Sequence, residues 1–565
     1  MSDVATQPLY ARLGRLLLRA RRWWLGAAIA FIYLYSFPYF EARYSADELP
    51  HIYLAMAMAE RGSLAIDDEI RSFQLTVGTS TYNGQTYSSH APGMSLLLVP
   101  VYAVMKLCSG GKPPPLARLF FWLRLFGAAI PSLLFVLFLS RCLDSDDRDR
   151  ATRRLLVLGY AVGSMALVYG TLLLSHHLAG ALLGTSFFLI RGIDLRPGRG
   201  GRVTAALSGL AAGAAALVDY TAVFVSPVLL VYLLVRARDW TYGQVAAAIA
   251  FCLAAAVPVA VLLTYHWLCF ESPFTTGMHH VTDPAMRNWL NSELFGLGGF
   301  SLAHLGQQLV SPRSGIFYYS PFLLLAGPGL VLMITRQGHI AEAVVCGFVI
   351  AVSYVLAGSL SHSQVGWSVG SRYLAYTVPF YVVPVAATVE AVRSRAIALG
   401  PAVGLVAAAM VTFTALAAVF PYYPDGFSDP FFNITARFGL AGYLPYNLGW
   451  LLGLSGLASV VPYLLVVGAL LLALLCSFGP GVARRMIVAV GALSVTAAIL
   501  TGYYSLLCHR VPPPASSIDS ISTTWQPRYR GLDGARLHRT IAPSAGFCQN
   551  APGCGQASPQ SPAQE

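Results

Sequence analysis

The stretch Tyr44-Ser-Ala-Asp-Glu-Leu-Pro-His-Ile-Tyr53 follows the apolar run 23–40 and decides how the chain is interpreted. Carboxylates at a membrane boundary are costly to desolvate, and they generally persist because they do chemistry or bind a cation. Asp47 and Glu48 therefore make the mouth of the first span a candidate functional site. In a second interpretation, Ser45 and Asp47 only cap a short amphipathic helix over 47–61.

Composition indicates an integral membrane protein. Of the 565 residues, 56% are hydrophobic and 11% are charged, whereas about a quarter of the residues in a soluble domain are charged. Repeated apolar runs of about 17–25 residues fit helices that cross a hydrocarbon core about 30 Å thick. The sequence therefore predicts an all-α polytopic membrane protein. The formal net charge of +12 is explained by arginines in short loops that set topology, so no nucleic-acid partner is predicted.

The distribution of arginines predicts the orientation of the chain. Five of them precede the first span (Arg12, Arg15, Arg19, Arg21 and Arg22), which indicates a cytoplasmic N-terminus and an outer segment 41–117. The apolar segment 92–107 is short and interrupted by proline. If it is a helix on the outer surface, all the arginine-rich loops face the cytoplasm (141–154, 191–202, 236–238, 393–395 and 484–485).

With this orientation the chain has about thirteen spans. They are predicted at 23–40, 118–140, 155–175, 178–195, 203–219, 221–235, 243–268, 319–335, 340–358, 373–392, 397–420, 447–476 and 486–507. We expect four regions: a basic cytoplasmic N-terminus (1–22), a transmembrane catalytic module with outer loops 41–117 and 269–318 (23–420), C-terminal transmembrane helices (421–507) and a polar, partly disordered periplasmic tail (508–565). The N-terminal apolar run lacks a cleavage site of the signal-peptide type. Cys548 and Cys554 can form a disulfide if the tail lies outside the cytoplasm.

Several polar residues fall at the predicted outer boundary. In Leu172-Leu-Leu-Ser-His-His-Leu178, His176 is either a ligand or hydrogen-bond donor facing Asp47, or a satisfied polar group of the bundle. His90, in Tyr87-Ser-Ser-His-Ala-Pro-Gly-Met94, either points toward Asp47 or belongs to a Pro-Gly turn.

Two arginines at this boundary are candidates for binding a phosphate. Arg372, in Gly366-Trp-Ser-Val-Gly-Ser-Arg-Tyr373, could bind a lipid phosphate through both of its terminal nitrogens, or act as an interfacial anchor with Trp367 and Tyr373. Arg313, in Ser311-Pro-Arg-Ser-Gly315, is a similar candidate. The sequence has no phosphate-binding loop or dinucleotide fingerprint, which favours a membrane-borne donor over a soluble nucleotide.

These features resemble the GT-C superfamily of glycosyltransferases. The resemblance lies in Asp47-Glu48 after the first span, in Tyr53 five positions beyond Glu48, and in the proline-containing helix 92–107. More specifically, the chain resembles bacterial relatives of the protein O-mannosyltransferases and the lipid A aminoarabinose transferases. The resemblance implies a GT-C-like bundle of about thirteen transmembrane helices with amphipathic helices on its outer face.

The resemblance also implies roles for individual residues. Asp47 matches the catalytic carboxylate of the family and Glu48 its neighbour. Tyr53, His90, His176, Arg313 and Arg372 would bind substrate. His90 stands where relatives often carry a basic residue followed by Pro-Pro, although here Ala91 intervenes and Gly93 replaces the second proline. His176 stands where relatives often carry Asp or His.

The expected function is sugar transfer with inversion at the outer face of a bacterial inner membrane. The donor would be a polyprenyl-phosphate-linked sugar among the membrane lipids, and the acceptor an envelope glycan, lipid or protein. Asp47 would remove the proton from the acceptor hydroxyl, and a divalent metal held by Glu48 and His176 is an option for assisting the phosphate. Two alternatives stay open: a transporter or flippase of lipid-linked saccharides, and an enzyme of the O-antigen ligase or polymerase type.

Overall fold

The computed structural model describes residues 24–37, 48–73, 78–146, 148–195, 199–237, 241–292, 298–335, 339–360, 369–419, 429–436, 439, 444, 447–478 and 481–507. Asp47, the N-terminal segment 1–22, and the tail with Cys548 and Cys554 lie outside the described residues. Within the described part, secondary structure is helical apart from one two-stranded sheet.

Eight of the described helices are long and apolar enough to cross a membrane. They are Arg118–Ser145, Arg199–Val218, Tyr242–Phe270, Ile340–Ser359, Arg372–Val392, Ala396–Val419, Gly456–Leu475 and Ala483–Gly502. Four shorter apolar helices cover Trp24–Tyr35, Gly93–Cys108, Tyr220–Arg236 and Pro321–Thr335. The chain is therefore an all-α polytopic membrane protein, as its composition predicts.

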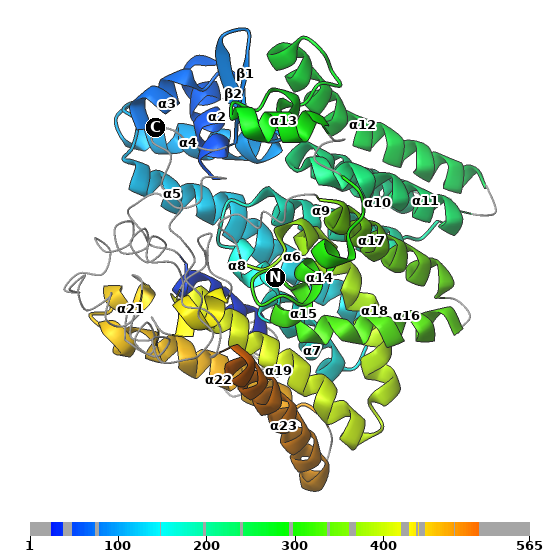
Figure 1. Ribbon diagram of the computed structural model, residues 1–565. Helices are drawn as coiled ribbons and strands as arrows, with labels where there is room; N and C mark the ends of the chain where they lie inside the picture. Colours follow the sequence, from blue (N-terminus) through cyan, green and yellow to red (C-terminus); the bar gives the residue numbers. More distant parts are fainter. Residues whose placement is uncertain are drawn as a thin grey trace, which may run out of the picture.

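Small residues let neighbouring helices approach closely. Helices α10 (Arg199–Val218), α11 (Ser226–Arg236) and α12 (Tyr242–Phe270) run side by side (Figure 1). A Cβ atom at Gly209 of α10 would lie 2.1 Å from the carbonyl oxygen of Phe251 in α12. Helix α9 (Ser175–Arg191) packs in the same way, since a Cβ at Gly180 would lie 2.7 Å from the Cα of Tyr376. Such glycines allow backbone contact between helices where lipid supplies no hydrophobic driving force.

The predicted continuous span 155–175 is wrong. The chain forms α7 (Arg150–Ala161) and α8 (Met165–Tyr169), separated at Gly163-Ser164. Ser164 caps α8, because its Oγ accepts from the Ala166 N–H at 3.2 Å. The Tyr33 hydroxyl lies 2.9 Å from the Ala161 carbonyl oxygen and 3.1 Å from that of Ala166. The Ala166 carbonyl oxygen also accepts from the Gly170 N–H at 2.9 Å, so Tyr33 supplies a further hydrogen-bond partner to the carbonyl groups at this break.

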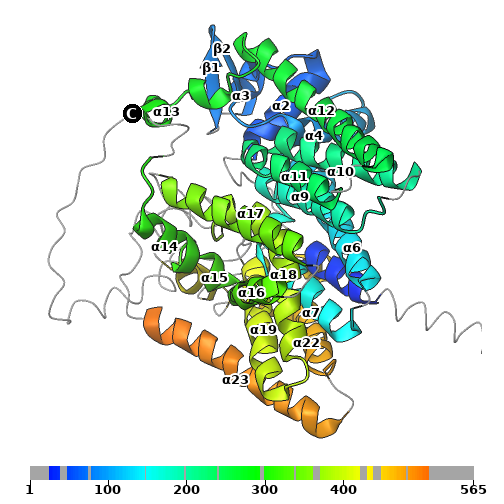
Figure 2. The ribbon, with the colours of Figure 1, turned by 90° about the vertical axis from the view of Figure 1, so that its right-hand side faces the viewer.

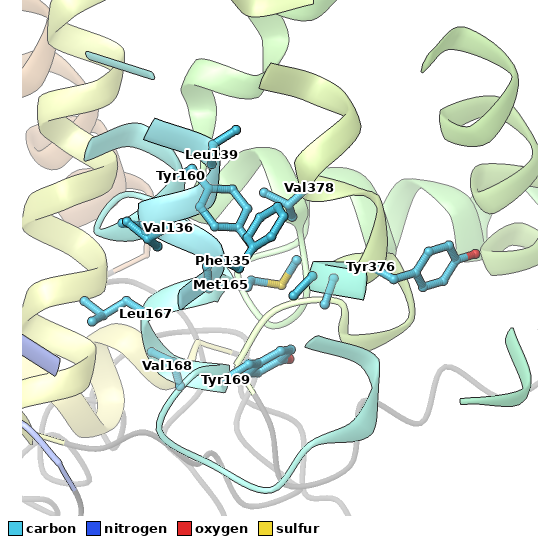
Figure 3. Close-up of a cluster of buried hydrophobic side chains, with 14 of the residues drawn as sticks. Phe135, Val136, Leu139, Tyr160, Met165, Leu167, Val168, Tyr169, Tyr376 and Val378 are labelled. Atoms are coloured by element: carbon cyan, nitrogen blue, oxygen red, sulfur yellow. The ribbon is translucent and has the colours of Figure 1, made fainter. Parts of the chain in front are cut away.

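Large apolar side chains surround this break. Figure 3 shows them gathered from four elements: α6 (Ile130–Ser145), α7, α8 and the start of α18 (Val378–Val392), whereas Tyr376 of the preceding η5 (Arg372–Thr377) points away from this group. The Ser320 hydroxyl donates to the Gly163 carbonyl oxygen at 3.1 Å.

The predicted span 447–476 is also shorter than expected, because α21 (Leu448–Leu451) is separated from the continuous helix Gly456–Leu475.

One end of the bundle, which we call the hairpin end, carries α2 (Leu49–Arg61), α3 (Asp67–Phe73), strands β1 (Thr79–Tyr82) and β2 (Gln85–Ser88), and α4 (Gly93–Cys108). It lies at the opposite extreme of the molecule from α23 (Val482–Leu507) (Figure 2). Helices α2 and α4 are joined by Glu60, which accepts from Lys106 Nζ at 2.8 Å. The helix predicted over 92–107 is thus present, and this ion pair links it to α2.

The hairpin is an element that the sequence analysis missed. The pairing sets Tyr82 opposite Gln85, and both turn residues have positive φ, 50° at Asn83 and 78° at Gly84. Asn-Gly is the strongest short-range signal for such a turn. A segment of the second predicted outer loop, η3 (Gly277–His280), packs on the hairpin, where the Ser80 hydroxyl donates to the Gly277 carbonyl oxygen at 2.6 Å.

The arginine-rich loops gather at another end, which we call the charged end. Arg148 and Arg191 both contact Asp146, at 3.2 and 2.6 Å, and Arg393 lies 3.4 Å from Asp149. A cavity of about 360 Å³ between the loops is lined by Asp146, Arg148, Asp149, Thr152, Arg191, His339, Glu390 and Arg393. These loops, which the positions of the arginines predict on one side of the membrane, therefore contact one another.

Candidate active site

Glu48 is held in a buried ion pair at the start of α2. Arg124 donates from Nε to Oε1 at 2.8 Å and from Nη2 to Oε2 at 2.6 Å, and neither side chain is exposed. The backbone N–H of Leu173 also donates to Oε1, at 2.9 Å. Bidentate pairs of this kind fix geometry as well as charge. Glu48 thereby joins α2, the end of α5 (Leu116–Arg124) and the segment that precedes α9.

Arg124 itself was missed in the sequence. It is the only charged residue within the apolar stretch 119–140, and its guanidinium also lies 4.8 Å from the Phe120 ring centroid. A charged residue inside a membrane segment is generally paired and functional. That rule alone would have marked Arg124 as a candidate.

The two consecutive histidines have different surroundings. They occupy the first turn of α9, where adjacent side chains point about 100° apart. The His177 side chain is 5% exposed, and its Nε2 lies 2.9 Å from the Ser132 hydroxyl. The His176 side chain is 15% exposed, and its Nδ1 lies 2.6 Å from Asp219 Oδ2. The interpretation as a satisfied polar group of the bundle thus fits His177, whereas His176 faces a carboxylate, that of Asp219.

Asp219 is a buried carboxylate between α10 and η2 (Tyr220–Phe224). Its Oδ1 accepts from the Thr221 N–H at 2.9 Å and from the Thr221 hydroxyl at 2.6 Å, and Oδ2 accepts from the Ser175 hydroxyl at 2.8 Å. Burial alone raises the pKa of this carboxyl, but the charge of His176 and the hydrogen bonds from His176, Thr221 and Ser175 lower the pKa well below its usual range. These contacts therefore favour the ionised form of Asp219.

Arg372 and His176 meet on one tyrosine. Arg372 Nη2 donates to the Tyr373 hydroxyl at 3.2 Å, and its guanidinium carbon lies 5.1 Å from the centroid of the same ring. The His176 ring packs edgewise against Tyr373 with 5.4 Å between centroids. Two of the residues chosen from the sequence, far apart in the chain, thus belong to one cluster. Trp367, the other suggested anchor, lies outside the described residues.

The turn that carries Arg313 borders the segment before Arg372. The Tyr319 hydroxyl donates to the Pro312 carbonyl oxygen at 2.7 Å and so fastens the turn. The Tyr319 ring lies against Gly370, where a Cβ would be 3.6 Å from Tyr319 Cδ2. Gly370 has φ of +69°, a conformation that L side chains rarely adopt. Tyr319 therefore connects the two arginine segments.

His90 lies at the base of the hairpin, against α2. Its ring is 4.9 Å from that of His51, between centroids, and His51 is 2% exposed. A Cβ at Gly78 would lie 2.7 Å from His90 Nε2, so the hairpin backbone covers the ring closely. His51 is three residues from Glu48, which puts His90 beside the first turn of α2.

Tyr53 is fully buried, and its ring stacks on Phe73 at 6.1 Å between centroids. The family resemblance implies a substrate contact for this tyrosine, five positions beyond Glu48. In the structure the ring is part of the apolar packing between α2 and α3.

Glu48 and His176 do not fit the divalent cation considered from the sequence. Both Glu48 oxygens accept from Arg124, and His176 Nδ1 faces Asp219. A cation at Glu48 would have to replace a buried guanidinium. Among the described residues, no group of three or more His, Cys, Asp or Glu side chains is arranged to hold a metal ion. We therefore derive no chemical step through a metal.

Fold and site together define a class: a polytopic helical membrane protein with a polar cluster at the end of the bundle where α2 begins. No protein-family model and no curated protein matches the chain. A search of solved structures found ArnT from Cupriavidus metallidurans in the apo state, with TM-score 0.46, 16% identity, and coverage of 94% of this chain and 85% of that chain. The structure of ArnT bound to undecaprenyl phosphate gave TM-score 0.41 and 15% identity over 92% and 85% of the two chains.

Proposed function

We propose that this protein is a membrane glycosyltransferase of the GT-C kind. It would move a sugar from a polyprenyl-phosphate donor to a hydroxyl group of an envelope glycan, lipid or protein. One observation carries the proposal: the Glu48 carboxylate binds the Leu173 amide, three residues before His176. Glu48 and the cluster of His176, Tyr373 and Arg372 therefore belong to one site.

Asp47 is the proposed general base. It takes the proton of the acceptor hydroxyl while that oxygen forms a bond to the anomeric carbon of the sugar. The bond between this carbon and the phosphate oxygen breaks on the opposite face, and its electron pair leaves with the polyprenyl phosphate. Attack from the face opposite the leaving group gives inversion. Arg372 and Arg313 would stabilise the charge that develops on the phosphate.

Glu48 has a supporting role in this proposal. Its carboxylate is neutralised by Arg124 and is fully buried, so it is a poor candidate for accepting a proton from substrate. It is peptide-bonded to Asp47 and anchors the chain where α2 starts. We therefore treat Glu48 as a positioning residue for the base.

The proposed orientation puts the N-terminus in the cytoplasm and the site at the outer face of a bacterial inner membrane. Its support is the charged end, where loops rich in arginine contact one another away from the His176 cluster. Short loops with many arginines are retained on the cytoplasmic side.

A transporter of lipid-linked saccharides is the second candidate, because the break between α7 and α8 is of the kind that transporters use to bind substrate. The carbonyl groups at this break already accept from Tyr33 and Ser320, however. Because these hydrogen bonds are made within the protein, the break has a structural role and not a substrate-binding one. This favours the transferase over the transporter.

Release of the carrier lipid distinguishes the two candidates. Membranes with and without the protein would be supplied with a radiolabelled polyprenyl-phosphate sugar. Transfer predicts that free polyprenyl phosphate appears together with label on envelope material. Movement of label across the membrane without release of polyprenyl phosphate would favour the transporter and contradict the transferase.

A further inference from the structure

We propose that Asp219 is a positioning residue that holds His176 as a cationic hydrogen-bond donor, beside Arg372, for the phosphate of the polyprenyl lipid. The inference rests on the proposed function and adds a second cation to the phosphate site. Neither a metal nor an additional arginine is needed for it.

The charge on Asp219 requires a partner. The carboxylate is 5% exposed, and an unpaired buried charge is very costly. Its described contacts are the hydroxyl groups of Ser175 and Thr221, the Thr221 amide and the imidazole of His176. Of these groups only His176 can carry a positive charge. The geometry therefore pairs the Asp219 carboxylate with the His176 ring.

The two oxygens of Asp219 have separate tasks. Oδ1 caps η2 through Thr221, a contact that needs no histidine. Oδ2 is directed at the first turn of α9, where it meets Ser175 and His176. Because Nδ1 of His176 faces Oδ2, Nε2 is the ring nitrogen that points away from the carboxylate. Asp219 therefore fixes which edge of the imidazole is offered to a ligand.

The neighbouring groups indicate an anionic ligand. His176 packs on the ring of Tyr373, and Arg372 binds the hydroxyl of the same residue. Two donors that can both be cationic are thus held around one tyrosine at the end of the bundle. A phosphate accepts several charge-assisted hydrogen bonds at once, which suits this arrangement.

The test measures lipid binding, so it is independent of transfer. The purified full chain in lipid nanodiscs would be titrated with a polyprenyl phosphate, and with the matching polyprenol as a neutral control. We expect Asp219→Asn and His176→Gln each to weaken binding of the phosphate about tenfold, equivalent to about 1.4 kcal/mol, and to leave binding of the polyprenol unchanged. Thr221→Val, which removes a hydrogen bond to Oδ1 only, should bind the phosphate within about twofold of wild type.

A charge rescue keeps the proposal testable if Asp219→Asn is unstable. The double variant His176→Arg/Asp219→Asn carries a permanent cation that needs no carboxylate, so it should recover the preference for phosphate over polyprenol. Phosphate binding by Asp219→Asn and His176→Gln within about twofold of wild type would overturn the inference. Equal losses for both lipids would also overturn it, because they indicate a structural role.

The lipid preference of wild type separates this inference from the proposed function. If wild type itself does not prefer the phosphate to the polyprenol, the proposed function fails. If wild type shows the preference and the Asp219 and His176 variants keep it, only the present inference fails.

Discussion

Both oxygens of the Glu48 carboxylate accept hydrogen bonds from within the protein, from the Arg124 guanidinium and the Leu173 amide. The sequence indicated that an acidic pair at this boundary is functional, but it gave no means of dividing the roles of Asp47 and Glu48. The division depends on Arg124, 76 positions away on another helix. In the same way, the two interpretations of His176-His177 were separated only by what lies beside each ring, namely Asp219 and Ser132.

Glu48→Gln should destabilise the protein strongly. The change leaves the buried Arg124 guanidinium without its counter-charge, which typically costs about 3–5 kcal/mol. Thermal unfolding of the detergent-solubilised variant should therefore shift well below wild type. The double variant with Arg124→Met removes both charges, so its loss should be smaller than the sum of the two single losses. Additive losses would show that the pair does not act as a unit.

At the scale of elements, most of the apolar runs predicted as spans form helices, and eight described helices are long and apolar enough to cross a membrane, because a helix satisfies its own backbone in lipid. The run 155–175 is apolar enough to span, yet it is broken. The break depends on Ser164 locally and on Tyr33, which lies in the first span and is distant in sequence. No local pattern reveals a hydroxyl supplied by another helix. The hairpin at Asn83-Gly84, by contrast, carried a local signal.

Tyr33→Phe tests the break between α7 and α8. The change removes one hydroxyl but leaves the Ala161 and Ala166 carbonyls buried with one partner fewer. We expect a loss of about 1–3 kcal/mol in the free energy of unfolding, measured by thermal or denaturant unfolding in detergent. Tyr242→Phe, at a tyrosine that is 84% exposed, is the matched control and should be neutral. Equal stability of the two variants would refute the role given to Tyr33.

Gly277→Ala tests the contact between η3 and the hairpin. The added Cβ would lie 2.7 Å from the Cα of Ser89, so the two segments must separate. Limited proteolysis should cut the variant within these segments faster than wild type. Gly299→Ala adds the same methyl group where no heavy atom lies within 4 Å, and its proteolysis should match wild type. Identical cleavage of the two variants would argue against a tight contact.

At the scale of the whole molecule, composition gives the class, and the distribution of arginines predicts the sidedness of the loops. A chain with 11% charged residues has too few of them to cover a soluble surface, and short arginine-rich loops are retained together on one side. The structure brings these loops into contact at the charged end. The grouping of His176, Asp219, Tyr373 and Arg372 could not be read in advance, because it depends on how α9, α10 and η5 pack.

Two native cysteines test the orientation. Cys108 is exposed at the end of α4, and Cys476 is exposed beside Ser477, which binds Arg154 of the charged end at 3.0 Å. In sealed right-side-out vesicles, a membrane-impermeant maleimide should label Cys108 and spare Cys476, as read by peptide mass spectrometry. Inside-out vesicles should give the reverse. Labelling of Cys476 in right-side-out vesicles would contradict the proposed orientation.

The central claim is sugar transfer from a polyprenyl-phosphate donor with Asp47 as the base. The most direct measurement compares wild type and Asp47→Asn, at matched amounts in vesicles, for release of polyprenyl phosphate from a labelled lipid-sugar pool. We predict release by wild type and a loss of at least about a hundredfold in the variant, in the range for removal of a general base. Release by Asp47→Asn at the wild-type rate, or no release by wild type, would contradict the account.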